Sequence, residues 1–138
     1  PSSRRGCVPR AARCRVTLIE SSRIAVADAV HNLAGRAADV VRASVGDWHP
    51  PADETFDVLI ADPARPGLGK PGVAAVARSA PAVVVLVSCD PVSLARDTAL
   101  LAGVGYRHDG TEVLDLFPHT HHVEAVTRFV PEPGRLGA

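Results

Sequence analysis

Short β-branched runs alternate along the chain with longer segments whose apolar residues recur at helical spacing. Such runs predict strands, and recurrence every three or four positions predicts helices. We therefore expect strands at 15–20, 39–47, 57–63 and 82–89, and helices at 23–35, 73–80 and 90–105. The run at 82–89 carries no charged residue, so this strand is predicted to be buried on both faces.

Strand and helix follow one another at the length of βα units, which predicts an α/β fold with a mostly parallel sheet and helices on both faces. The segment 106–131 is predicted to form two strands joined by 117–122. No helix separates these strands, so we expect an antiparallel C-terminal hairpin at one edge of the sheet. No segment is apolar enough over its length to predict a membrane span.

The basic residues are unevenly distributed, although the whole chain is balanced at 15 basic and 15 acidic residues. The first fifteen residues contain five arginines and no acid. Such an arm is either an irregular, solvated end or a segment that binds a phosphate backbone. We expect residues 1–14 to be irregular and basic, residues 15–131 to form the folded domain, and residues 132–138 to be a tail.

Three cysteines, Cys7, Cys14 and Cys89, form no closely spaced pair. Their number and spacing argue against a disulfide framework and against a metal centre completed within the chain, so a reducing, cytoplasmic setting is expected. His119, His121 and His122 lie close together without a companion cysteine, so we predict no metal site there.

Acidic residues end three of the predicted strands, namely Glu20, Asp47 and Asp62. The carboxyl ends of strands in such a sheet line one crevice, where ligands bind and an acid accepts hydrogen bonds from ribose hydroxyls. Three such acids favour an adenosine-containing ligand, unless they only cap helices and close turns. The strand and glycine-rich turn that usually open this kind of site are not found before residue 15, where Gly6 is the only glycine.

Cys89 stands where the apolar strand stops and the next helix begins, with Asp90 suited to the N-cap of that helix and Pro91 to its first turn. A cysteine there is either a buried core residue or a nucleophile presented at the carboxyl end of a strand. As a nucleophile it would act as the thiolate, and covalent addition divides a difficult reaction into easier steps.

Four motifs occur in order: DPARPG at 62–67, SCDP at 88–91, LARD at 94–97 and FPHTHHVE at 117–124. Together they resemble the signature motifs of the S-adenosylmethionine-dependent RNA 5-methyluridine methyltransferases, the TrmA/RlmD-type family. The similarity extends over most of the chain, from about Arg15 to Pro131. It implies a class I methyltransferase, Rossmann-like fold whose first strand and glycine-rich loop are missing or degenerate. The family's upstream RNA-binding region is also absent, so we expect a truncated carboxyl-terminal catalytic domain.

The resemblance implies functions for five residues. Cys89 matches the nucleophile that adds to carbon 6 of a uracil, and Glu124 matches the general base that removes the carbon 5 proton. Glu20, Asp47 and Asp62 match positions that contact the cofactor S-adenosylmethionine, with Glu20 at the ribose. The implied partner is transfer or ribosomal RNA, without a membrane and without a metal in this chain.

Four other residues near these motifs have two interpretations each. Arg65 or Arg96 holds a backbone phosphate, or is a solvated surface charge. His121 and His122 orient Glu124 or contact RNA.

Three functions remain open from the sequence. The preferred one is uracil-C5 methylation of RNA through a covalent Cys89 adduct. The second is an inactive remnant of the fold that acts as an RNA-binding or interaction module, which the truncated start and the modest net charge favour. The third is a class I methyltransferase with another acceptor, although amino-group methylation normally needs no cysteine and typically shows an Asn/Asp-Pro-Pro-aromatic loop instead of DPAR.

Overall fold

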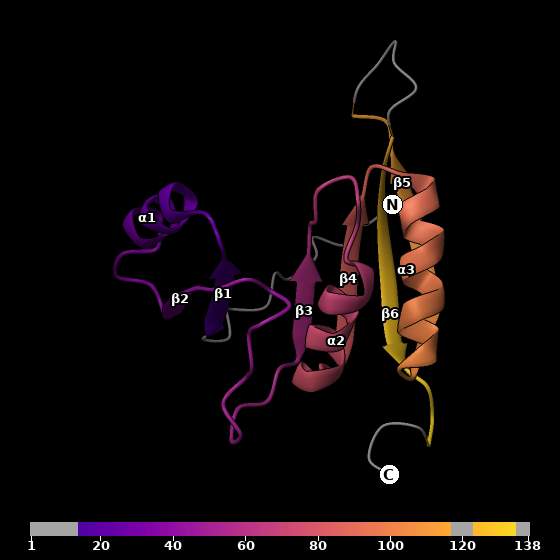
Figure 1. Cartoon of the computed structure of the whole chain (residues 1–138), viewed down its shortest axis with the longest axis horizontal. Helices are drawn as coiled ribbons and strands as arrows, with labels where there is room; N and C mark the ends of the chain where they lie inside the picture. Colours follow the sequence, from indigo (N-terminus) through magenta and orange to yellow (C-terminus); the bar gives the residue numbers. More distant parts are fainter. Residues whose placement is uncertain (1–13, 117–122, 135–138) are drawn as a thin grey trace, which may run out of the picture. The chain divides into compact units, whose positions relative to one another are not determined.

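The computed structural model describes residues 14–116 and 123–134, which divide into two compact units (Figure 1). The first unit is Pro1–Ser44 and the second is Val45–Ala138. Each unit contains its own sheet, and the two are described separately. The helices and strands alternate as the sequence predicts.

The first unit is a single βαβ element. Strand β1 (Val16–Glu20) pairs in parallel with β2 (Ala38–Arg42), and helix α1 (Arg23–Asn32) connects them. The hydroxyl of Ser22 accepts a hydrogen bond from the amide of Ala25 at 3.4 Å, which confirms Ser22 as the N-cap. No residue of α1 is fully buried, so the part of this unit that the structure describes has little core of its own.

The predicted strand 39–47 is wrong in its second half, because β2 ends at Arg42. Arg42 pairs with Glu20, the last residue of β1, and the amide of Ala43 makes one more bond, to the carbonyl of Glu20 at 3.1 Å. Beyond that point β1 offers no backbone groups for a ladder, so the chain turns. Asp47 therefore lies in a turn and does not end a strand.

The second unit has a four-stranded mixed sheet in the order β3-β4-β6-β5. Strand β3 (Val58–Ala61) is parallel to β4 (Val83–Ser88), whereas β6 (Glu124–Pro131) is antiparallel to both β4 and β5 (Tyr106–Leu114). The predicted antiparallel C-terminal hairpin is confirmed. Its second strand, β6, lies inside the sheet, and its first strand, β5, forms the edge.

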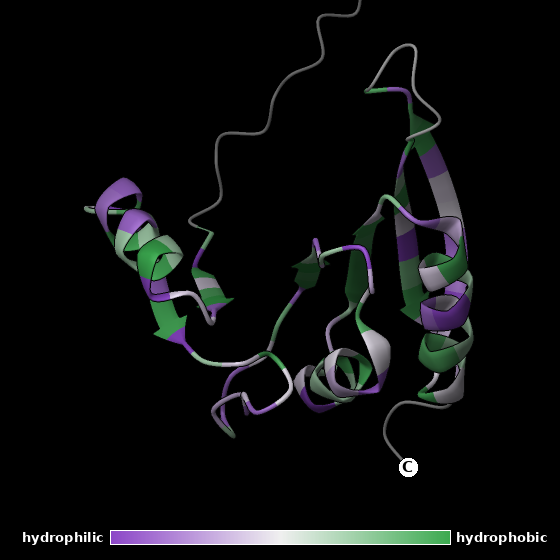
Figure 2. Ribbon diagram, turned by 45° about the horizontal axis from the view of Figure 1, so that its top comes forward, coloured by the Kyte–Doolittle hydropathy of each residue, from purple (hydrophilic) through white to green (hydrophobic). Residues whose placement is uncertain are grey.

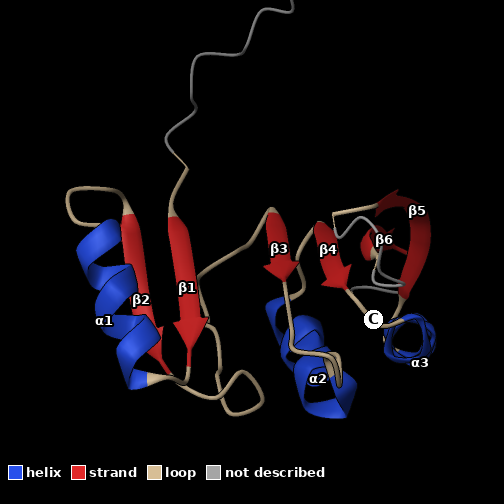
Figure 3. Ribbon diagram, turned by 90° about the horizontal axis from the view of Figure 1, so that it is seen from above, coloured by secondary structure: helices blue, strands red, loops and turns tan. Residues whose placement is uncertain are grey.

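Both helices of this unit cover the same face of the sheet (Figure 3). They are α2 (Gly69–Ser79) and α3 (Pro91–Gly103). Their apolar sides and alternate strand residues form one buried cluster, made of Val73, Val76, Val84, Leu86, Leu101, Tyr106 and Phe129. The expectation of helices on both faces does not hold for the described residues of this unit.

Strand β4 is apolar along its length (Figure 2) but only one of its faces is fully buried. Val84, Leu86 and Ser88 point into the core, while the residues between them are half-buried on the face without helices. Helix α2 begins at Gly69, four residues before the predicted start, because Pro71 falls in its first turn, where no amide donor is needed. None of the helices in the described part of the chain is long and apolar enough to cross a membrane.

Tyr106, the first residue of β5, is 1% exposed, and its hydroxyl donates a hydrogen bond to the carbonyl of Pro81 at 2.8 Å. Burial penalises the phenolate and raises the pKa of Tyr106 to about 12. An acid whose pKa is raised on folding holds its proton more tightly in the folded state. The stability that it contributes is complete below the unfolded pKa of about 10 and is lost as the pH rises toward 12.

Because Tyr106 is the only tyrosine in the chain, tyrosinate absorbance reports on it alone. We expect titration near pH 12 in the native protein and near pH 10 in urea, with the free energy of unfolding falling between these values. Tyr106→Phe removes the signal and leaves the Pro81 carbonyl without its donor, so it should destabilise the protein by about 1 kcal/mol. Native titration near pH 10 would contradict the buried hydrogen bond.

Candidate active site

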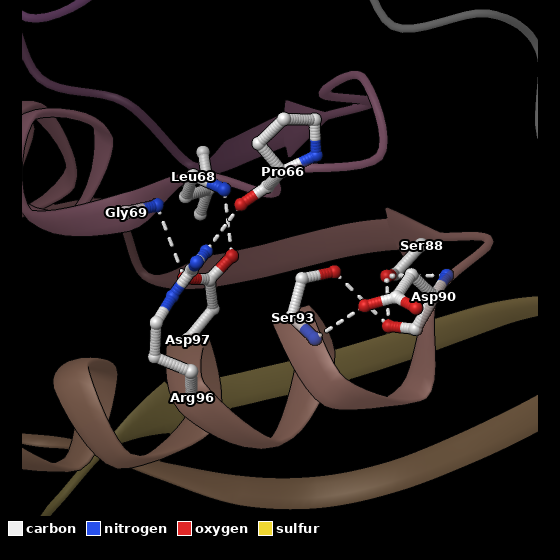
Figure 4. Close-up of polar contacts among 8 residues, drawn as sticks. All are labelled: Pro66, Leu68, Gly69, Ser88, Asp90, Ser93, Arg96 and Asp97. Carbon is white, nitrogen blue, oxygen red and sulfur yellow. Dashed lines mark hydrogen bonds and ion pairs between the residues drawn. The ribbon is translucent and has the colours of Figure 1, made fainter.

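Cys89 lies in a tight turn between the end of β4 and the start of α3. The Ser88 hydroxyl donates to the carbonyl of Asp90 at 3.1 Å and accepts from the amide of Asp90 at 3.4 Å (Figure 4). These two bonds close the backbone around Cys89, whose thiol is half-buried and not part of a disulfide. Ser88 itself is buried, so the turn is fixed to the core of the sheet.

Asp90 caps the helix that follows, as predicted. Its carboxylate accepts from the amide of Ser93 at 2.6 Å, and the Ser93 hydroxyl donates to the Asp90 carbonyl at 3.0 Å. The bond from the Ser93 amide lowers the pKa of Asp90 below its ordinary value; the positive charge of Arg65 acts in the same direction, and burial opposes both. Pro91 occupies the first turn of α3, where its missing amide costs nothing.

Glu124 is the first residue of β6 and is half-buried. The last antiparallel pair between β4 and β6 joins Ser88 to Ala125. Cys89 directly follows Ser88, and Glu124 directly precedes Ala125, so both residues lie at the same end of this ladder. Two residues that are 35 positions apart in sequence are thereby brought to one end of the sheet.

Asp62 follows β3 directly and is exposed. Strands β3 and β4 are parallel, and Ala61 pairs with Leu86, so Asp62 and Cys89 both lie beyond the carboxyl ends of neighbouring strands. Asp62 is the first residue of the loop between β3 and α2, and Arg65 belongs to the same loop. This loop and the Cys89 turn thus lie at the same end of the sheet, beyond the carboxyl ends of β3 and β4.

Glu20 is itself the last residue of a parallel strand, β1, in the first unit. Its Oε1 atom accepts from the amide of Ser22 at 2.6 Å and from the Ser21 hydroxyl at 3.4 Å. A carboxylate has about four acceptor positions, so these contacts leave Glu20 able to bind hydroxyl groups.

Asp47 does not lie at the end of the sheet where Asp62 and Cys89 lie. The guanidinium of Arg78 donates to the carbonyl of Gly46 at 2.8 Å and to that of Trp48 at 2.9 and 3.2 Å, which fixes the turn on either side of Asp47. Arg78 is in the last turn of α2, the end that leads into the start of β4. Asp62 and Cys89 lie at the opposite end of the sheet, after the last residues of β3 and β4.

Sequence reasoning missed one buried acid, Asp97 of the LARD motif, which is 1% exposed. It lies seven residues after the N-cap Asp90, on a stripe of α3 that also holds Ser93 and Leu101. An acid at core spacing on a helix was the available signal. The described residues contain no group of three side chains able to hold a metal ion. His119, His121 and His122 lie outside the described residues.

Comparison with known proteins places these elements in context. No family model matches the chain. It is 38% identical over 123 residues to an uncharacterized RNA methyltransferase of Bifidobacterium longum, covering 85% of the chain and 28% of the relative. It is 45% identical over 86 residues to the 23S rRNA (uracil(1939)-C(5))-methyltransferase RlmD of Yersinia enterocolitica, covering 62% of the chain and 19% of the relative.

A solved structure is similar over most of the described chain. The tRNA (uracil-54, C5)-methyltransferase of Pyrococcus abyssi, in complex with S-adenosyl-L-homocysteine, superposes with a TM-score of 0.72 at 36% identity. The match covers 84% of this chain and 29% of that one. The chain therefore spans less than a third of the length of each of these three proteins.

The cap at Asp90 gives a test of the Cys89 turn. Asp90→Ala should lower the melting temperature by a few degrees, whereas Asp90→Asn, which keeps an acceptor for the Ser93 amide, should stay close to the parent at neutral pH. Because folding lowers the pKa of Asp90, its ionic contribution is present above the ordinary pKa and is lost as the pH falls through the lowered folded value. Melting curves by circular dichroism would measure both effects, and an unchanged Asp90→Ala variant would contradict the cap.

Proposed function

Because the chain belongs to the TrmA/RlmD-type family of S-adenosylmethionine-dependent RNA 5-methyluridine methyltransferases, we propose that it methylates carbon 5 of a uridine in RNA. The observation that carries this proposal is the β4–β6 ladder, whose last pair joins Ser88 to Ala125, so that Cys89 and Glu124 are the next residues at the same end of the sheet. A nucleophile and a base at one end of the sheet fit a reaction that adds to one carbon of a ring and removes a proton from its neighbour. The named relatives act on 23S rRNA and on tRNA, and either class of RNA suits the chemistry.

The residues have separate roles in the proposed reaction. The Cys89 thiolate adds to carbon 6 of the uracil, and the electron pair of the carbon 5–carbon 6 double bond moves onto carbon 5 and its neighbouring carbonyl. When bound, S-adenosylmethionine would supply the electrophilic methyl group to carbon 5, and its sulfur would keep the electron pair of the broken sulfur–methyl bond, leaving as S-adenosylhomocysteine. Glu124 then removes the proton from carbon 5, the double bond forms again, and the Cys89 thiolate leaves. The enzyme returns to its starting state once Glu124 loses that proton to solvent.

The residues present fit the cofactor that the family uses. Glu20 ends one parallel strand and Asp62 follows another, and both can accept hydrogen bonds from hydroxyl or amino groups, which is the chemistry that an adenosine and a methionine moiety require. Asp47 matches a cofactor position in the family pattern but has less support, because its turn is held at the far end of α2. We therefore propose Glu20 and Asp62 as the main cofactor contacts.

An inactive remnant of the same fold remains the alternative. The observation that favours it is the balance of 15 basic and 15 acidic residues, which gives the chain little net attraction for a polyanionic RNA. Cofactor binding by this chain separates the two proposals.

Isothermal calorimetry with S-adenosylhomocysteine is the first experiment. Under the main proposal the chain binds it, Glu20→Ala and Asp62→Ala each weaken binding by about tenfold or more, and Asp47→Ala has a smaller effect. Asp28→Ala, which changes an exposed acid on α1, is the matched control and should bind like the parent. A folded chain that does not bind would support the inactive alternative.

Covalent trapping tests the catalytic pair. An RNA that carries 5-fluorouridine should form an adduct stable in denaturing gels, because Glu124 cannot remove fluorine as it removes a proton. Cys89→Ala should abolish the adduct, and Cys14→Ala, which changes the exposed cysteine, should not. With ordinary uridine RNA, Glu124→Gln should lower turnover by about a hundredfold or more and accumulate the adduct. Trapping that survives Cys89→Ala would overturn the assignment of the nucleophile.

A further inference from the structure

Asp97 lies in the middle of α3, yet its carboxylate serves the neighbouring helix α2. It accepts hydrogen bonds from the amide of Leu68 at 2.6 Å and from the amide of Gly69 at 3.0 Å (Figure 4). These amides open α2, whose N-cap residue, Leu68, has no side chain able to cap. The first amides of a helix lack intrahelical partners, and an anion there also interacts favourably with the helix dipole. Asp97 thus supplies, from α3, the cap that the local sequence of α2 lacks.

Arg96 closes the same contact from the other side. Its guanidinium donates to Oδ1 of Asp97 through Nε at 3.0 Å and through a terminal nitrogen at 2.8 Å. The same terminal nitrogen donates to the carbonyl of Pro66. The Asp97 side chain is 1% exposed and that of Arg96 is 47% exposed, so Arg96 neutralises a buried carboxylate while it holds the loop backbone.

The loop lies so close to α3 that only glycine fits at position 67. Gly67 has φ +75°, and a Cβ atom built on it would be 2.3 Å from Oδ2 of Asp97, 2.7 Å from the Arg96 guanidinium and 3.1 Å from Cβ of Ser93. Its amide donates to the carbonyl of Ala64 at 2.8 Å, which closes a turn. The shape of the loop is therefore set by its contact with α3.

Ser93 joins this contact to the Cys89 turn. It bonds Asp90 through its amide and its hydroxyl, and its Cβ faces Gly67. Ser93 and Asp97 are four residues apart, one turn of helix, on the same side of α3. One helix thus holds both the turn that presents Cys89 and the loop that begins at Asp62.

We propose that Arg96 and Asp97 are positioning residues that clamp the loop 62–68 to α3, so that the cofactor-contacting loop and the nucleophile keep a fixed geometry. The role of this geometry in catalysis rests on the proposed function, whereas the clamp itself rests only on the contacts described above. It gives Arg96 a role other than the phosphate contact considered from the sequence. Fixing the loop orders Asp62 and Arg65 before substrates bind, which removes an ordering cost from the reaction.

Two variants of the whole 138-residue chain test the clamp without an activity assay. Asp97→Asn removes the negative charge and one of the two acceptor atoms. Arg96→Gln keeps Asp97 but removes the hydrogen bond to the Pro66 carbonyl. If Asp97→Asn does not fold, Arg96→Gln is the variant to use. Hydrogen exchange of the Leu68 and Gly69 amides should accelerate by about tenfold or more in Asp97→Asn and less in Arg96→Gln. Asp53→Asn, an exposed acid before β3, should exchange like the parent. Unchanged exchange in both variants would overturn the clamp.

Kinetics separate positioning from the other possible roles of Arg96. Positioning predicts that Arg96→Gln lowers kcat for methyl transfer by about tenfold while KM for RNA changes by less than about threefold. A raised KM with unchanged kcat and a smaller salt dependence would instead assign Arg96 to a phosphate contact and overturn the proposal. A lower melting temperature with both constants unchanged would also overturn it. If the parent transfers no methyl group, the proposed function fails, and the exchange measurement alone decides the clamp.

Discussion

The position of β4 in the sheet is the constraint on which the site depends. This strand has β3 as a parallel neighbour and β6 as an antiparallel neighbour, so its carboxyl end lies beside the carboxyl end of one and the beginning of the other. Asp62, Cys89 and Glu124 come from three separate parts of the chain, and the two ladders bring them to the same end of the sheet. A shift of either register by one residue would move a side chain to the opposite face.

Helix α3 fixes the positions of the Cys89 turn and of the loop before α2 at this end of the sheet. Its first acid, Asp90, caps its own amino end, and its second, Asp97, caps α2. Both carboxylates accept hydrogen bonds from backbone amides, and these amides would otherwise lack a partner next to a buried core. The family motifs SCDP and LARD therefore combine reactive and structural residues, with Cys89 as the proposed nucleophile and the acids as its frame.

The sheet of the second unit is covered by helices on one face only within the described residues. Val58 and Ile60 of β3 are 51% and 72% exposed on the other face, and β3 has a ladder partner on one side.

Local signals in the sequence determined the order of the helices and strands and the caps of α1 and α3. Ser22 and Asp90 cap the helices that they were predicted to cap, because an N-cap bond joins residues only three apart. The motifs also pointed to Cys89 and Glu124, since residue type carries the chemistry. Only the tertiary structure decided that these two lie at the same end of the β4–β6 ladder, that Asp47 lies in a turn fixed by Arg78, and that Asp97 caps another helix. Strand register and hydrogen bonds between distant segments depend on how the elements pack, and no local pattern of residues encodes them.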